Sequence, residues 1–165
     1  MEDSLTARVV VDCQGMNARQ THLVRKSFAA VERQAEVAAL VFYRRLFELD
    51  PGLRPLFKSD IQEQAKKLMD MLAAALNLLE RPAELAGELE ELGAKHAGYG
   101  TQPEHYATVR QALLDMLAEI LRDAFTAEMQ QAWSELYDFM EAAMLRGAAV
   151  AGQRPNDGCS SRANR

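Results

Sequence analysis

Apolar residues recur three or four positions apart through nearly the whole of this 165-residue chain. This spacing puts them on one face of an α-helix, whereas a half-buried strand would need strict alternation. No alternating run rich in Val, Ile and Thr is long enough to suggest a sheet. The pattern predicts an all-α fold, and a 48% hydrophobic content suits one domain with a real core.

Breaks in the periodicity divide the chain into helices. Proline disfavours helix in the residue before it and fits the first turn of the next, so Asp50-Pro51 should end one helix and start a short helical turn. Ser59 with Gln62, and Thr101 with Glu104, have the spacing of capping boxes. We expect long helices at about 19–34, 36–49, 61–79, 83–97, 103–120 and 126–147.

The ends of the chain have a different composition from its centre. Residues 19–147 should form the folded domain. Residues 1–18 are an N-terminal extension with enough apolar content for a short helix or a strand-like arm. Residues 148–165 are mostly polar and rich in Gly, Pro and Ser, which predicts a disordered C-terminal tail.

Composition excludes several functional classes. No stretch approaches the roughly 18 uninterrupted apolar residues of a membrane span, and the acidic start does not resemble a secretory signal, so we expect a cytoplasmic protein without membrane insertion. Cys13 and Cys159 lie far apart without CxxC or histidine neighbours, which argues against a disulfide framework or a zinc site. The net charge is −5 with interspersed basic residues, so a nucleic-acid footprint is absent.

One histidine occupies an unusual position. Leu85, Leu89, Leu92 and His96 follow one another at spacings of four, three and four, so His96 continues an apolar helical stripe. It can be a neutral core histidine with hydrogen-bonded ring nitrogens, or the ligand of a metal or cofactor. The residues of this stripe leave both interpretations open.

Two further polar side chains fall on predicted inward faces. Tyr43 shares a face with Leu40 and Phe47, so its hydroxyl should be buried and need a partner. Gln64 lies four residues before Leu68, at or on the edge of an inward stripe, where an amide is costly without partners. Each residue alone is compatible with a satisfied core group or a boundary side chain.

The order of the segments resembles that of the globin family over about residues 19–147. The resemblance is closest to single-domain bacterial haemoglobins and the globin half of flavohaemoglobins, and more distant to vertebrate neuroglobin. It implies a three-over-three helical sandwich that binds haem b, iron protoporphyrin IX. Five segments carry the resemblance: FYRRLFELDPGLRPLF (42–57), IQEQAKKLMDML (61–72), LGAKHAGYG (92–100), TQPEHYATVRQALL (101–114) and FTAEMQQAWSELY (125–137).

The resemblance assigns roles to individual residues. His96 matches the proximal ligand of the iron, and Phe57 matches the ring that packs on the porphyrin. Tyr43 and Gln64 match hydrogen-bond donors at the sixth iron position, where bound oxygen becomes negatively polarised and is stabilised by such donors. The remaining residues expected around the cofactor are Lys67, Leu68, Tyr99, Tyr106, Val109 and Tyr137.

Several of these assignments have alternatives. Phe57 and Leu68 can be ordinary core residues, and Lys67 can be a solvated lysine instead of a partner for a haem propionate. Tyr106 and Tyr137 match proximal tyrosines that help to orient the histidine. Their glutamate partner in the family would fall near Ala148, which weakens the expectation of peroxidase-type proximal activation. His22 and His105 are expected at the surface.

The sequence is compatible with four functions. The first is a globin that reversibly binds oxygen, carbon monoxide and nitric oxide, with tight oxygen binding and a role such as oxygen transport. The second is a nitric oxide dioxygenase that depends on a separate reductase, because the chain has no room for a reductase domain. The third is a haem-based gas sensor, and the fourth is a cofactor-free helical scaffold. The sequence leaves open whether the protein is a monomer or a homodimer.

Overall fold

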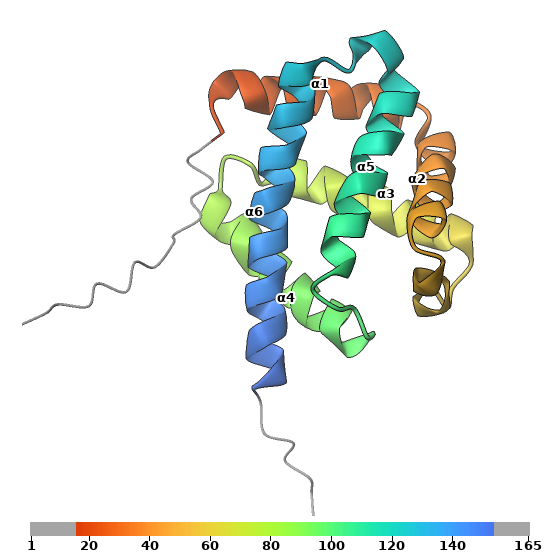
Figure 1. The fold of residues 1–165 in the computed structure, drawn as a ribbon. Helices are drawn as coiled ribbons and strands as arrows, with labels where there is room; N and C mark the ends of the chain where they lie inside the picture. The colour runs from red at the N-terminus through yellow and green to blue at the C-terminus, as the bar shows by residue number, and fades with distance from the viewer. Residues whose placement is uncertain (1–15, 154–165) are drawn as a thin grey trace, which may run out of the picture.

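The computed structural model describes residues 16–153 (Figure 1). Within this range it contains helices and connecting turns and no strand, so the all-α prediction is confirmed. The long helices lie within a few residues of the predicted ranges. The elements are α1 (Ala18–Glu32), α2 (Ala35–Leu49), η2 (Pro51–Leu56), α3 (Ile61–Asn77), α4 (Pro82–Gly98), α5 (His105–Leu121), η3 (Arg122–Ala124) and α6 (Ala127–Gly152).

The helix starts only partly follow the sequence signals. As predicted, α2 ends before Pro51, and the Asp50 side chain accepts a hydrogen bond of 2.9 Å from the Gly52 amide. Both predicted capping boxes were wrong: α3 and α5 are preceded by Asp60 and Glu104, and neither side chain bonds the helix end. A true capping box instead joins Asn17 and Gln20 at the start of α1.

The helices pack around one apolar core. α6 lies against α4 and α1, while α2 lies against α5 and α3 (Figure 1). Trp133 of α6 is 1% exposed, and its indole nitrogen donates a 2.9 Å hydrogen bond to Ser27 of α1. This bond satisfies a polar group that burial would otherwise make costly, and it fixes α1 on α6.

The face of α2 differs from the prediction. Leu40 is 53% exposed, so it does not share the buried face assigned to it. The inward face is formed by Ala38, Ala39, Val41, Phe42, Tyr43 and Leu46. Tyr43 is nevertheless buried, and its ring packs against those of Phe42 and Phe47.

The C-terminal boundary also differs. α6 continues to Gly152, so the prediction of a disordered tail was wrong for residues 148–152. The sequence AAVAG there contains three alanines, the best helix formers, and the helix extends through them. The rest of the predicted tail and residues 1–15 of the predicted extension lie outside the described residues.

None of the helices in residues 16–153 is both long and apolar enough to span a bilayer.

Candidate cofactor site between α3 and α4

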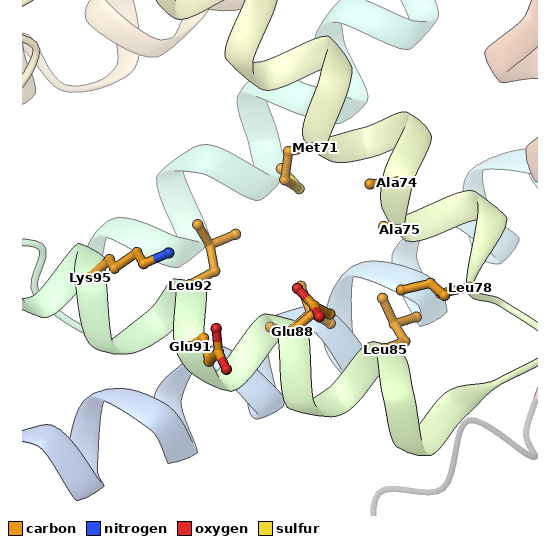
Figure 2. Close-up of a pocket in the computed structure, with 10 residues that line it drawn as sticks. Met71, Ala74, Ala75, Leu78, Leu85, Glu88, Glu91, Leu92 and Lys95 are labelled. Atoms are coloured by element: carbon orange, nitrogen blue, oxygen red, sulfur yellow. The ribbon is translucent and has the colours of Figure 1, made fainter.

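A cavity of about 230 Å³ lies between the C-terminal half of α3 and α4 (Figure 2). Its walls are mainly apolar, with Glu88, Glu91 and Lys95 as the charged groups. Leu92 and Lys95, which line the cavity, belong to the turn of α4 that carries His96. Met71, on the opposite wall, lies one turn beyond Leu68 on α3. The apolar lining consists of Met71, Ala74, Ala75, Leu78, Leu85, Leu89 and Leu92.

His96 lies near the end of α4 and is half-buried. Its Nδ1 donates a 2.8 Å hydrogen bond to the backbone carbonyl of Leu92, one turn earlier. This bond leaves Nε2 with the free lone pair of a neutral imidazole, which is the form that binds metals. The local geometry therefore suits a ligand and gives Nδ1 the partner that a core histidine would also need.

Aromatic side chains gather where α2 meets the segment after η2. Tyr43 packs edge-on against Phe57 with ring centroids 5.4 Å apart, and Phe47 packs edge-on against Phe57 at 5.5 Å. Arg54 lies over the Phe47 ring, with its guanidinium carbon 4.9 Å from the centroid. The structure thus brings Tyr43 and Phe57, two of the predicted site residues, into one aromatic cluster.

The Tyr43 hydroxyl points to α3. It donates a 3.2 Å hydrogen bond to the backbone carbonyl of Gln64, which is longer than usual for an O–H donor and therefore weak. Burial raises the pKa of Tyr43 to about 12, so the hydroxyl keeps its proton at neutral pH. Tyr43 is 5% exposed. Its hydroxyl is a donor, and its acceptor in this structure is the main chain of Gln64, the residue expected to lie beside it at the site.

The side chains of α3 have graded exposure. Gln64 and Leu68 are half-buried, and the described residues provide no hydrogen-bond partner for the Gln64 side-chain amide. Lys67 is exposed and pairs with Glu63 at 3.6 Å. Gln64 therefore has a free donor at the edge of the core, whereas the Lys67 ammonium already has a carboxylate neighbour.

The two predicted proximal tyrosines form a unit of their own. The Tyr137 hydroxyl donates a 2.7 Å hydrogen bond to the backbone carbonyl of Tyr106, and both residues are buried. Burial, with the charge of Glu141 nearby, raises the pKa of each phenol. His96 Nδ1 donates its hydrogen bond to the Leu92 carbonyl and to neither tyrosine, so these phenols join α5 to α6.

The other candidates lie farther from the buried interior. Tyr99 is 70% exposed, although its ring centroid is 6.5 Å from that of His96. Val109 is half-buried on α5 and packs against the core. His22 is exposed, and the Nδ1 of half-buried His105 accepts a 3.0 Å hydrogen bond from the Gln102 amide at the start of α5.

The donor set fits a haem and does not fit a bare metal ion. No group of three or more His, Cys, Asp or Glu side chains that could hold an ion occurs in residues 16–153. A single imidazole, on the turn of α4 whose Leu92 and Lys95 line an apolar cavity, is instead what an iron porphyrin requires, since the macrocycle supplies the other iron ligands. Lys95 at the cavity could pair with a carboxylate of the group.

The family follows from comparison with known proteins. The Globin family model matches residues 40–144, and the chain belongs to the globin family. Neuroglobin from Tetraodon nigroviridis is 31% identical over 156 residues, covering 86% of this chain and 98% of that protein. Neuroglobin from Danio rerio is 30% identical with the same coverage.

Solved structures agree with this assignment. An engineered carbene transferase from Rhodothermus marinus, whose parent is described as a nitric oxide dioxygenase, matches with a TM-score of 0.74 and 29% identity over 83% of this chain and 96% of its own. A hexacoordinated haem protein from a tardigrade has the same fold, with a TM-score of 0.74 and 21% identity over 82% of this chain and 96% of that protein. The predicted globin fold is confirmed, and this family binds haem and diatomic gases.

Sequence reasoning missed three residues near the site. Met71 and Lys95 line the cavity, but their exposed or mixed surroundings gave no signal beyond their place one turn from Leu68 and next to His96. Glu141 lies one turn after Tyr137 on α6, and burial raises its pKa. The spacing of four from Tyr137 would have placed Glu141 on the same helix face.

Proposed function

We propose that this globin binds oxygen reversibly at a haem b whose iron is ligated by Nε2 of His96. The observation that carries this proposal is the half-buried imidazole of His96, whose Nδ1 is bonded to the carbonyl of Leu92, a residue that lines the apolar cavity. That bond favours the tautomer with a free Nε2 and holds the ring orientation. The haem iron supplies the position at which a diatomic gas binds.

The apolar residues of the pocket have two tasks. Half-buried Phe57 and Leu68, which pack against the core, would contact the porphyrin and help to exclude water from it. Exclusion of water strengthens every hydrogen bond made inside the pocket. Lys95 would pair with a haem carboxylate at the cavity edge, and Lys67 is the alternative cation on α3.

Tyr43 and Gln64 would select among the gases. Both can donate hydrogen bonds, and the Tyr43 hydroxyl keeps its proton because burial raises its pKa to about 12. Oxygen draws more negative charge from iron than carbon monoxide does, so the same donors stabilise it more. A hydrogen bond to a charged acceptor contributes about 1.5–3 kcal/mol, which would slow oxygen loss roughly ten- to a hundredfold.

The visible absorption spectrum tests this function. Purified protein, reconstituted with haem and reduced, should show a Soret band that shifts when carbon monoxide or oxygen is added. His96→Ala should lose the five-coordinate histidine spectrum. A wild-type protein without a Soret band, or a His96→Ala protein with an unchanged spectrum, would refute the proposal.

A second candidate is nitric oxide dioxygenase activity. The Rhodothermus marinus relative, whose parent is described as such an enzyme, favours it at 29% identity. This activity would need a separate reductase to return the iron to its reduced form. Steady nitric oxide consumption with a generic flavin reductase, oxygen and NADH would support the enzyme. A single stoichiometric turnover would leave the oxygen-binding function alone.

A further inference from the structure

α4 and α6 cross with their backbones in direct contact. A Cβ atom built on Gly93 would lie 1.9 Å from the carbonyl oxygen of Met144, and one built on Gly147 would lie 1.8 Å from that of Glu90. Neither position tolerates a side chain, because the opposing atoms are main chain and cannot rotate away. Gly87 and Gly98, also on α4, have nothing within 4 Å of such a Cβ atom.

This crossing involves the turn of α4 that carries the candidate iron ligand. Gly93 precedes His96 by three residues, and Leu92, which accepts the hydrogen bond from His96 Nδ1, is next to Gly93. Arg146 and Glu90 add an ion pair of 3.0 Å over the same contact. α6 therefore contacts the turn that fixes both the position and the ring orientation of the histidine.

The cavity lies on the other side of this turn. With about 100° between successive residues of a helix, Glu90 and Gly93 face α6, whereas Leu92 and Lys95 point away from it and line the cavity. A Cβ atom at the crossing would need about 1.5 Å of extra separation to reach van der Waals distance. α6 also packs against α1 and α5, whereas a cavity lies between α4 and α3, so the added methyl group would move α4 towards α3 and the cavity.

α4 also needs this support for its own stability. It contains Gly87 and Gly93 in its interior, and each interior glycine disfavours helix by about 1 kcal/mol relative to alanine. Gly93 is buried at the contact with α6. The residue that permits this close contact therefore also weakens α4 as an isolated helix. Tertiary packing, and not intrinsic propensity, must then keep this part of the chain helical.

We propose that Gly93 and Gly147 are positioning residues for the proximal ligand. Their crossing keeps the His96 turn folded before haem enters and sets how far His96 extends towards the iron. The second part rests on the proposed function, and the first part does not. His96 is thus held from behind by α6 at a defined depth.

Hydrogen exchange of the haem-free protein tests the first part. In the wild-type chain, the amides of residues 92–97 should be protected to a similar degree as those in the middle of α6. Gly93→Ala and Gly147→Ala should each raise exchange in this segment by roughly tenfold or more while α1 and α2 change little. Gly87→Ala is the matched control and should preserve or increase protection, since alanine favours helix.

The wild-type measurement decides this part even when a variant does not fold. Exchange of the wild-type segment at the rate of an open loop would overturn the proposal, as would full protection in both crossing variants. Circular dichroism identifies any variant that is globally unfolded. In that case Arg146→Met, which removes only the ion pair, should still increase exchange in α4 more than in α1.

Resonance Raman spectroscopy of the reduced, haem-loaded protein tests the second part. Gly93→Ala and Gly147→Ala should shift the iron–histidine stretching band to higher frequency, because α4 moves towards the iron, and Gly87→Ala should leave it in place. An unshifted band in both crossing variants would refute the positioning role. Absence of haem binding by the wild-type protein would refute the proposed function and leave the exchange result to decide on the crossing.

Discussion

The two walls of the candidate site are built on different principles. On the α4 side, backbone atoms determine the geometry: the Leu92 carbonyl orients His96, and the Gly93–Gly147 crossing fixes the helix. On the α3 side, side chains determine it: Gln64 is half-buried, and the Tyr43 hydroxyl makes a weak bond of 3.2 Å to a carbonyl. The α4 side is therefore set by the fold, whereas the α3 side can adjust.

This difference separates two properties of the protein. Whether haem binds should depend on the α4 wall, because a coordinate bond requires a histidine at a fixed position. Which gas binds, and for how long, should depend on the α3 wall, where a weak hydrogen bond can be exchanged for a better one. Variants on the two sides should consequently change different measurements.

The largest effect is expected from the α4 wall. His96→Gly removes the imidazole and should weaken haem retention by at least about a hundredfold. Loss of a residue that only hydrogen-bonds to a metal ligand already costs about ten- to a hundredfold, and loss of the ligand itself should cost more. Transfer of haem to an excess of another apoprotein measures this loss. Added imidazole should restore the five-coordinate spectrum in His96→Gly, and a failure of rescue with intact haem binding would mean that another residue ligates the iron.

The α3 wall should affect oxygen dissociation. Gln64→Leu removes a donor that has no partner among residues 16–153, so the full hydrogen bond is lost and dissociation should accelerate by about ten- to a hundredfold. Tyr43→Phe should accelerate it only about three- to tenfold, because the wild-type hydroxyl must first release the Gln64 carbonyl.

Stopped-flow displacement of oxygen by carbon monoxide measures both rates. Carbon monoxide dissociation from the same variants is the control and should change much less. Unchanged oxygen dissociation in both variants would contradict the assignment of Tyr43 and Gln64 to the pocket. A larger effect of Tyr43→Phe would mean that its hydroxyl is already directed at the gas.

The sequence predicted the helices and the place of His96 on α4, because both follow from periodicity and breaks within one segment. It predicted the burial of Tyr43 but only part of its surroundings, since Phe47 packs against it, whereas Leu40 is exposed and Phe57 comes from the segment after η2. Gly93 and Gly147 each disfavour helix when their segments are considered alone. Their role arises only when two segments more than 50 residues apart meet, which single-segment patterns do not contain.

The buried phenol of Tyr43 should make stability depend on alkaline pH. Its pKa is about 12 in the folded chain against 10 ordinarily, so the stabilising difference is complete below pH 10 and is lost as pH rises through 12. Tyr43→Phe should flatten this decline by up to about 2–3 kcal/mol in the free energy of unfolding. Tyr106 and Tyr137 are shifted in the same direction, so part of the decline should remain.

Urea unfolding of the haem-free protein at pH 8, 10 and 11 measures how the free energy of unfolding changes with pH. Tyr99→Phe is the control, because Tyr99 is 70% exposed and its replacement should leave the wild-type pH dependence intact. Parallel curves for Tyr43→Phe and the wild-type protein would show that the phenol is accessible to solvent in the folded state.

The smallest effect compares one lysine from each wall. Lys67 pairs with Glu63 and its side chain is 60% exposed, while Lys95 lines the cavity and forms no ion pair within residues 16–153. An exposed ion pair contributes at most about 1 kcal/mol, so Lys95→Met should speed haem loss by up to about fivefold and Lys67→Met by less than about twofold. Lys66→Met, which affects only a pair with Asp70, serves as the control in the haem-transfer assay. The reverse order would place the haem carboxylates at α3, as the family resemblance suggests for Lys67, and would mean that haem binding separates Lys67 from Glu63.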